Sequence, residues 1–344
     1  MDTTLSCENI KLYSTFKPLE VSVDILNVGD ADGIIIWIRK YNPFDELVLV
    51  IDGGKNSKGA EKIVDTLNEQ ILPFTGFLNT DNLIVKRKNR PDYVICSHPD
   101  RENIIGLFNI LENFKDTPLV LKTNDLVFSY NPMVDQTIFR LNFPESLIHL
   151  IEFKMFHSNI ISINDENLIT KLKDFDIEIL GPTDEYYNQI YPKFSTLESY
   201  FSTLLNETID CRLHLTGNDP NPFNKTSIIL MLNIGNEKYL FPGDADVEAI
   251  KNIPNYYKKL QNVRFVKLPN RGSRNNLNKE IIDLLNPDIV VISATESLNH
   301  PNENIIQLFN LKKTKIFSTH EIGNIRLFKN MNDRKTGCYY EQKI

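Results

Sequence analysis

From residue 21 onward, the sequence has a series of short apolar runs separated by turn-forming residues. Three of them, at 21–28, 33–40 and 46–52, follow one another with glycine, proline or aspartate between them. Apolar runs of this length, bounded by such residues, are typical of β-strands. We therefore predict three consecutive strands that form a meander.

A helical spacing of apolar residues comes after the third strand. Gly53 and Gly54 end that strand, and residues three or four apart then indicate a helix. A fourth strand at 91–97 leads through His98 into a second helix over 102–114. The residues that carry the two helical stripes are Ala60, Ile63, Val64 and Leu67, and then Ile104, Ile105, Phe108 and Leu111.

The same order of elements returns towards the end of the chain. The segments 91–105 and 287–306 share a Pro-Asp start, an apolar run that ends in serine, and a His-Pro pair followed by Glu-Asn-Ile-Ile. This similarity suggests an internal duplication. Two such halves predict an α/β fold, a four-layer αββα sandwich. The strands expected in the second half are 227–234, 237–244, 263–269 and 287–293, and a final helix begins near Asn302.

The chain is predicted to form one domain over residues 1–344. Its central segment, approximately 115–216, is less regular and is interpreted as an insertion. The tail carries two more strand-like runs, at 315–319 and 324–330, which we predict to form a final hairpin.

Composition narrows the class of protein. The net charge of -7 argues against broad electrostatic capture of nucleic acid, although local basic patches remain compatible with it. The four cysteines are far apart and indicate neither a zinc knuckle nor a disulfide framework. With no apolar run of about 18 residues and no leader-like start, we expect a cytoplasmic protein and no membrane partner.

The candidate chemistry lies where the fourth strand ends. His98, Asp100 and Glu102 occupy alternate positions there, and Asp244 ends a strand in the other half. Imidazole and carboxylate groups that converge from such positions are typical ligands of zinc or manganese, which generate hydroxide from bound water. Asp52 is similarly placed, although a single aspartate is more often a turn former.

The motifs resemble, in order, those of the metallo-β-lactamase fold. They cover about residues 20–112 and 222–330, and they are most similar to the soluble hydrolase domain of the bacterial competence DNA-uptake protein ComEC and its stand-alone relatives. The segments that carry the resemblance are LNVGDADGIIIWI, VLVIDGG, PDYVICSHPDRENIIGL, NKTSIILML, KYLFPGDAD, VKLPNRGSRNN and PDIVVIS with NHPNENII.

The resemblance implies a degenerate metal site. The family's HPDxDHxGG loop keeps His98 and Asp100 here, but Glu102 replaces the second aspartate and Asn103 the second histidine. The bridging aspartate corresponds to Asp244. The HHGSR segment falls on 270–274, without either histidine, and the late histidine on His300. Asparagine is a poor ligand for zinc.

Two states of this site remain open. One divalent ion, zinc or manganese, is held by His98, Asp100 and Asp244 with help from Glu102, or no ion is held at all. In the second state Arg271, at the position of a metal ligand, supplies positive charge to Asp100 and Asp244 in the metal's place.

Two functions follow from these states. In the first, the protein is a metal-dependent phosphodiesterase or nuclease acting on nucleic acid or another phosphodiester. Its predicted catalytic residues are Asp100, Asp244, Arg271, Ser273 and His300, with Arg274 beside Ser273 on the phosphate. In the second, it is an inactive pseudo-hydrolase, or pseudoenzyme, that binds or regulates a protein partner. A third alternative is a metal-free hydrolase with His98 and Asp100 as acid and base, for which no residue is marked as the nucleophile.

Overall fold

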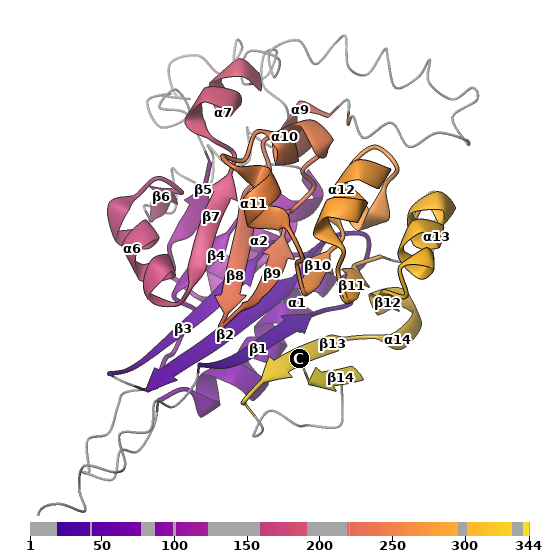
Figure 1. The fold of residues 1–344 in the computed structure, drawn as a ribbon. Helices are drawn as coiled ribbons and strands as arrows, with labels where there is room; N and C mark the ends of the chain where they lie inside the picture. The colour runs from indigo at the N-terminus through magenta and orange to yellow at the C-terminus, as the bar shows by residue number, and fades with distance from the viewer. Residues whose placement is uncertain are drawn as a thin grey trace, which may run out of the picture.

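The structure is a computed structural model that describes residues 19–41, 43–76, 87–98, 101–122, 159–190, 219, 221–294, 301–331 and 340–343. For residues 101–105, 222 and 342–343 it describes the backbone alone. Figure 1 shows the described part as two twisted sheets with helices on their outer sides.

The first sheet has eight strands within the described residues, in the order β14-β13-β1-β2-β3-β4-β5-β6. The meander β1-β2-β3 is antiparallel, as predicted, and β4, β5 and β6 continue the sheet in parallel. The bounds are β1 (Glu20–Ile25), β2 (Ile34–Tyr41), β3 (Phe44–Ile51), β4 (Tyr93–Ile95), β5 (Leu119–Leu121), β6 (Ile160–Ser162), β13 (Ile325–Lys329) and β14 (Tyr340–Lys343).

The second sheet has six described strands, in the order β12-β11-β10-β9-β8-β7. It repeats the plan of the first: β7, β8 and β9 are antiparallel, and β10, β11 and β12 follow in parallel. The bounds are β7 (Ile177–Gly181), β8 (Ile229–Ile234), β9 (Glu237–Phe241), β10 (Phe265–Lys267), β11 (Ile289–Ile292) and β12 (Lys315–Ser318).

Alternate residues of the strands explain the layers. Ile34, Ile36 and Ile38 of β2 belong to one apolar cluster with Leu230 and Leu232 of β8, so this cluster fills the space between the sheets. Neighbouring residues of the same strands, such as Ile35 and Trp37, join a second cluster that contains apolar side chains of the helices. Because both faces of these strands are buried, they are apolar almost throughout. The fold is therefore the four-layer αββα sandwich that the sequence predicted.

The helices occupy the outer layers, with α1 and α2 on the side of the first sheet and α10 to α13 on the other (Figure 1). Among the described helices none is long and apolar enough to cross a membrane. The α-helices are α1 (Ser57–Thr66), α2 (Arg101–Asn113), α6 (Glu166–Asp174), α7 (Asp184–Ile190), α9 (Pro222–Lys225), α10 (Val247–Lys251), α11 (Tyr256–Leu260), α12 (Lys279–Leu285), α13 (Glu303–Leu311) and α14 (Thr319–Ile322), with a π-turn at Leu67–Ile71 and 3₁₀ turns at Leu72–Phe74 and Pro269–Gly272.

Two glycines fix how α2 meets the end of β3. A Cβ atom on Gly106 would lie 2.0 Å from the carbonyl oxygen of Gly53, and one on Gly53 would lie 2.2 Å from the backbone nitrogen of Leu107. Only glycine allows backbones to approach so closely. This contact places the N-terminal half of α2 directly over the end of β3.

The predicted hairpin in the tail is wrong. The two runs became β12 and β13, which belong to different sheets. The short helix α14 separates them: the Ser318 side chain accepts a hydrogen bond from the His320 backbone to start it, and Gly323, at φ 77°, ends it. The chain then crosses to the first sheet, where β13 pairs with β1.

The central segment contributes to both sheets where it is described. Its β5 and β6 extend the first sheet, β7 pairs with β8 in the second, and α6 packs Leu168 and Leu172 into the apolar cluster between the sheets. Residues 123–158 and 191–218 of this segment lie outside the described residues. The interpretation of 115–216 as an insertion in a single domain stays a prediction.

Candidate functional site

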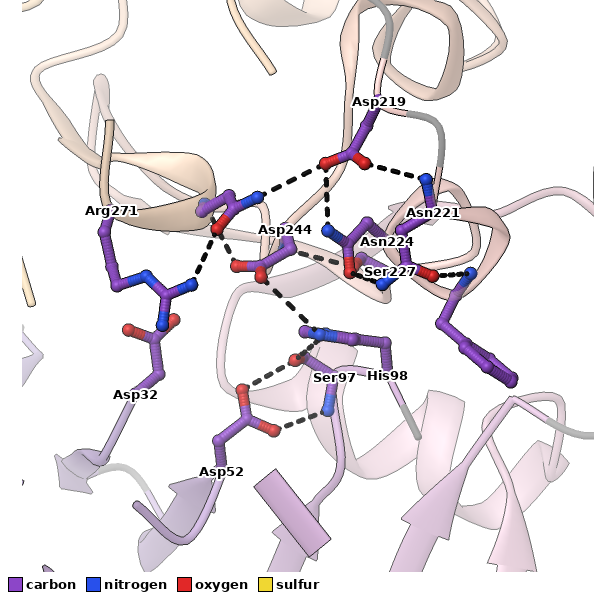
Figure 2. A network of polar contacts seen from close by, with 12 residues as sticks. Asp32, Asp52, Ser97, His98, Asp219, Asn221, Asn224, Ser227, Asp244 and Arg271 are labelled. Carbon is purple, nitrogen blue, oxygen red and sulfur yellow. Dashed lines mark hydrogen bonds and ion pairs between the residues drawn. The ribbon is translucent and has the colours of Figure 1, made fainter. Parts of the chain in front are cut away.

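The sandwich brings a histidine and an aspartate from different sheets together at one edge. His98 follows β4, Asp244 follows β9, and His98 Nε2 lies 3.6 Å from Asp244 Oδ2 (Figure 2). Both side chains are largely buried. The backbone N–H of Ile228 donates to the carbonyl of Ser97 at 2.8 Å, which joins the two halves beside them. The site is therefore complete only when both sheets are assembled.

A carboxylate and a hydroxyl lie behind His98. Asp52, directly after β3, takes the left-handed conformation at φ 58°, where aspartate is better tolerated than most residues. It accepts two hydrogen bonds from Ser97, from the backbone N–H at 2.8 Å and from the hydroxyl at 2.6 Å. The Ser97 hydroxyl also lies 2.9 Å from Nδ1 of His98. These contacts form a continuous chain from Asp52 to Asp244.

Burial dominates the ionisation of Asp52. Removal from water raises the pKa of Asp52 to about 7; charge on His98 opposes this rise, the charge of Asp32 adds to it, and the Ser97 hydrogen bonds oppose it. Asp52 therefore changes its charge near neutral pH.

Asp244 shows the opposite behaviour. Burial disfavours its charged form, but the positive charges of His98, Lys267 and Arg271 outweigh burial and hold the pKa of Asp244 below its usual value. The backbone N–H of Asn270 donates to Oδ1 of the same carboxylate at 3.0 Å. Asp244 is thus an anion stabilised by protein groups on both oxygens.

A buried ion pair lies next to this site. Lys267, the last residue of β10, contacts the carboxylate of Asp32 in the loop between β1 and β2, and both side chains are almost inaccessible. The pair connects the second sheet with the first. Neither residue was among the candidates predicted from the sequence, because a partner so distant along the chain leaves no local pattern.

The turn after β10 places Arg271. Asn270, Arg271 and Gly272 have φ angles of 40°, 56° and 79°, three consecutive left-handed conformations. Nη1 of Arg271 donates to the carbonyl oxygen of Asp30 at 2.6 Å, and Nη2 donates to Oδ1 of Asn270 at 3.1 Å. Figure 2 shows its guanidinium beside Asp32. The expected pairing with Asp100 lies outside the described residues and stays a prediction.

An amide cluster around Asp219 supports the turn, and sequence reasoning missed it. Asp219 Oδ2 accepts hydrogen bonds from the side-chain amides of Asn224, Asn270 and Asn276, at 2.9, 3.2 and 3.0 Å. Asn276 also donates to the carbonyl of Asp244 at 2.6 Å. The asparagines in PNPFNK and NRGSRNN were a visible signal, but nothing in the sequence indicated that they share one acceptor.

The other predicted site residues are placed only in part. Ser273 is buried, and its hydroxyl accepts a hydrogen bond from the backbone N–H of Asn275 at 3.2 Å, so its contact with a phosphate stays a prediction. Asp100, the Glu102 side chain and His300 lie outside the described residues.

The described residues do not complete a metal site. His98 and Asp244 supply two ligands of the kind that zinc or manganese accepts, one fewer than the three protein ligands of catalytic zinc sites. Within the described part of the chain, no group of three or more His, Cys, Asp or Glu side chains could hold an ion.

The architecture and the position of the site define the class of fold. An αββα sandwich with two repeated sheets, and with His98 and Asp244 at the ends of β4 and β9, is the metallo-β-lactamase-like fold that the motifs predicted. In sequence, the chain is similar to ComE operon protein 3 of Bacillus subtilis (strain 168), at 25% identity over 110 residues. That match covers 31% of this chain and 14% of the relative, and it agrees with the predicted ComEC-like resemblance.

Two solved structures align with most of the chain at low sequence identity. CmlA, a diiron β-hydroxylase from Streptomyces venezuelae, superposes with a TM-score of 0.40 and 12% identity over 91% of this chain and 54% of its own. The metallo-β-lactamase fold protein YhfI from Bacillus subtilis gives 0.38 and 9% over 88% and 96%. No family model matches the chain.

Proposed function

We propose that this chain is a pseudo-hydrolase, a binding or regulatory protein on a metallo-β-lactamase-like fold whose metal site has eroded. The observation that supports this most directly is the state of Asp244. Its Oδ1 accepts the Asn270 N–H, its Oδ2 faces His98, and nearby cations favour its charge. Protein groups thus provide the compensation that metal ions would give a bridging carboxylate.

The class of ligand is proposed from the ComEC-like resemblance of the motifs. We propose a protein partner or a bound phosphodiester, including nucleic acid, as the class of ligand. The similarity to ComE operon protein 3 covers only a small share of that protein, so its wider activity is not carried over.

A metal-dependent phosphodiesterase is the second candidate. The observation that favours it is the 3.6 Å pair of His98 and Asp244, which keeps an imidazole and a carboxylate side by side. Asp100 would be the third ligand, and Arg271 would face the substrate phosphate.

Metal content and cleavage, measured on the same preparation, separate the two candidates. After dialysis without chelator, elemental analysis should find clearly less than one zinc or manganese ion per chain. Hydrolysis of bis(p-nitrophenyl) phosphate with added manganese or zinc should be no faster for wild type than for Asp244→Asn. Asp283→Asn, which removes an exposed carboxylate on α12, is the control for altered charge. One stoichiometric ion, together with cleavage that Asp244→Asn abolishes and Asp283→Asn retains, would instead establish the phosphodiesterase.

A further inference from the structure

The second sheet ends, among the described strands, at β7, whose only strand partner is β8 (Figure 1). Where β7 begins, the carbonyl of Asp176 accepts the backbone N–H of Asn233 at 2.8 Å, so these two residues occupy a hydrogen-bonded position of the antiparallel ladder. Such positions alternate along a strand, and Glu178 is therefore the next residue of β7 that bonds to β8. It follows that Ile177 and Ile179 direct their backbone N–H and C=O groups away from β8.

These outward backbone groups have no partner within the described part of the chain. Ile177 is nevertheless only 2% exposed. Buried backbone N–H and C=O groups are almost always paired, either with protein groups or with ordered water. Because water at this edge can be replaced by another strand, the outer edge of β7 is a template for strand addition.

A groove of about 370 Å³, within the size range of ligand-binding pockets, follows this edge. All five residues of β7 line it, with Ile163 and Ile169 on the side of α6 and with Pro254 and Lys259 on the side of α11. Successive side chains of a strand point to opposite faces of its sheet. Alternate side chains of an added strand therefore meet the two isoleucines, and the side chains between them meet Pro254 and Lys259.

The charge of this groove is opposite to that of the whole chain. The groove and the pocket that adjoins it along Leu180 are lined by five lysines and two acids, which are Lys122, Lys173, Lys238, Lys258, Lys259, Glu178 and Asp184. Each acid pairs with one lysine, but Lys173 and Lys258 have no carboxylate partner within the described residues. On a chain with a net charge of -7, this local excess of positive charge favours an acidic partner.

We propose that the outer edge of β7 is a docking site for an extended acidic segment of a partner protein, which adds to the second sheet as a further strand. Its backbone pairs with Ile177 and Ile179, its apolar side chains alternate with acidic ones, and the acidic ones face the lysines. None of the residues that line the groove belongs to the His98–Asp244 site. The inference therefore does not depend on the proposed function, and it applies equally to a pseudo-hydrolase and to an enzyme.

A change at Ile179 tests the pairing, because its N–H points into the groove and not towards β8. Ile179→Pro removes this donor, and proline is tolerated at an edge position whose N–H makes no bond within the sheet. The probe is a fluorescein-labelled nine-residue peptide in which valine alternates with glutamate, titrated with the full chain by fluorescence anisotropy. Wild type should bind it, and Ile179→Pro should bind it about tenfold more weakly. Ile179→Ala, which keeps the N–H, should bind within about threefold of wild type.

The charge of the groove is tested separately. The double variant Lys173→Glu and Lys258→Glu should weaken binding by roughly tenfold, whereas the same charge change at the exposed Lys58 and Lys313 should leave it nearly unchanged. A peptide with lysine in place of every glutamate should bind wild type at least about tenfold more weakly. If circular dichroism shows that Ile179→Pro does not fold, the charge variants decide together with hydrogen exchange, which should slow at residues 177–181 when the glutamate peptide is bound.

Several outcomes would overturn the proposal. These are no binding of the glutamate peptide, equal binding by folded Ile179→Pro and wild type, or protection from exchange only outside residues 177–181. A wild-type dimer that Ile179→Pro dissociates, measured by light scattering, would assign the edge to a second copy of this chain and would also overturn it. No cleavage or metal measurement enters these results, so they can fail or succeed independently of the proposed function.

Discussion

A carboxyl group buried as completely as that of Asp52 works against folding whenever it is ionised. Its pKa is about 7 in the folded protein and 3.8 in an exposed chain, so the folded state binds its proton more tightly. The contribution of Asp52 to the free energy of unfolding must then fall as pH rises from about 4 to 7. The difference between the two pKa values corresponds to about 4 kcal/mol at most.

Asp52→Asn should remove this pH dependence. The variant and wild type should be similarly stable near pH 4, and the variant should become more stable by up to about 4 kcal/mol near pH 8, because the amide never ionises. Urea unfolding of both proteins at a series of pH values measures this difference in the free energy of unfolding. Asp244→Asn is the matched control with the opposite sign: the pKa of Asp244 is lowered, so its loss should destabilise the protein at neutral pH and matter less in acid. Parallel curves for Asp52→Asn and wild type would contradict the prediction.

The sequence predicted some residues of the candidate site and gave no signal for others. His98 and Asp244 were predicted from motif order, and the structure brings them together. Ser97, Asp219 and Lys267 were not predicted to act at the site, because their partners lie tens or hundreds of residues away. A hydrogen bond between distant residues has no periodicity that a single sequence can reveal.

Among the local elements, the left-handed turn after β10 places the Arg271 guanidinium beside the site. There it donates a hydrogen bond to Asp30 in the loop between β1 and β2. Arg271→Ala should lower the free energy of unfolding by about 1 to 3 kcal/mol, since it removes hydrogen bonds to Asp30 and Asn270 from a half-buried position. The loss should be largest near neutral pH. Asp244, whose pKa is lowered, contributes stability above about pH 3.8 that disappears in acid, and Arg271 supports that contribution.

Thermal unfolding from pH 3 to pH 8 checks the effect of Arg271, with Arg271→Lys as the variant that keeps the charge. A loss that is the same at every pH would show that the charge of Arg271 does not act on Asp244. In the phosphodiesterase alternative, Arg271→Ala would in addition lose cleavage.

The elements themselves were largely predictable. Apolar runs with turn residues at their ends gave β1 to β4 and β8 to β11, because these strands are buried on both faces and their composition shows it. Asn302 caps α13, as the sequence suggested. The prediction for the tail was wrong because two adjacent strand-like runs are typical of a hairpin. In the structure α14 and Gly323 redirect the chain from one sheet to the other.

For the molecule as a whole, the Lys267–Asp32 pair is a charged contact between the two sheets. Lys267→Met should destabilise the protein by about 3 to 5 kcal/mol, because it leaves the buried carboxylate of Asp32 without its cation. Adding Asp32→Asn should recover part of the loss, since the carboxylate in contact with Lys267 is then neutral, whereas Asp244 still lacks the nearby charge of Lys267.

Equilibrium urea unfolding of both single variants and the double variant measures this coupling. Lys279→Met is the control: Lys279 forms an exposed pair with Asp283 on α12, which is worth about 0.5 kcal/mol or less. A loss for Lys267→Met as small as that of the control would mean that Asp32 finds compensation elsewhere.

The pairing of β13 with β1 has a consequence for how the protein is made. Ser22 of β1 is opposite Phe328 of β13, so β1 waits, after it leaves the ribosome, for roughly 300 residues of further translation before its outer edge is covered. At about 5 to 20 residues per second, that wait is roughly 15 to 60 s. Throughout this time the nascent chain exposes an apolar strand edge to the cell, and it depends on chaperones or on transient pairing to avoid aggregation.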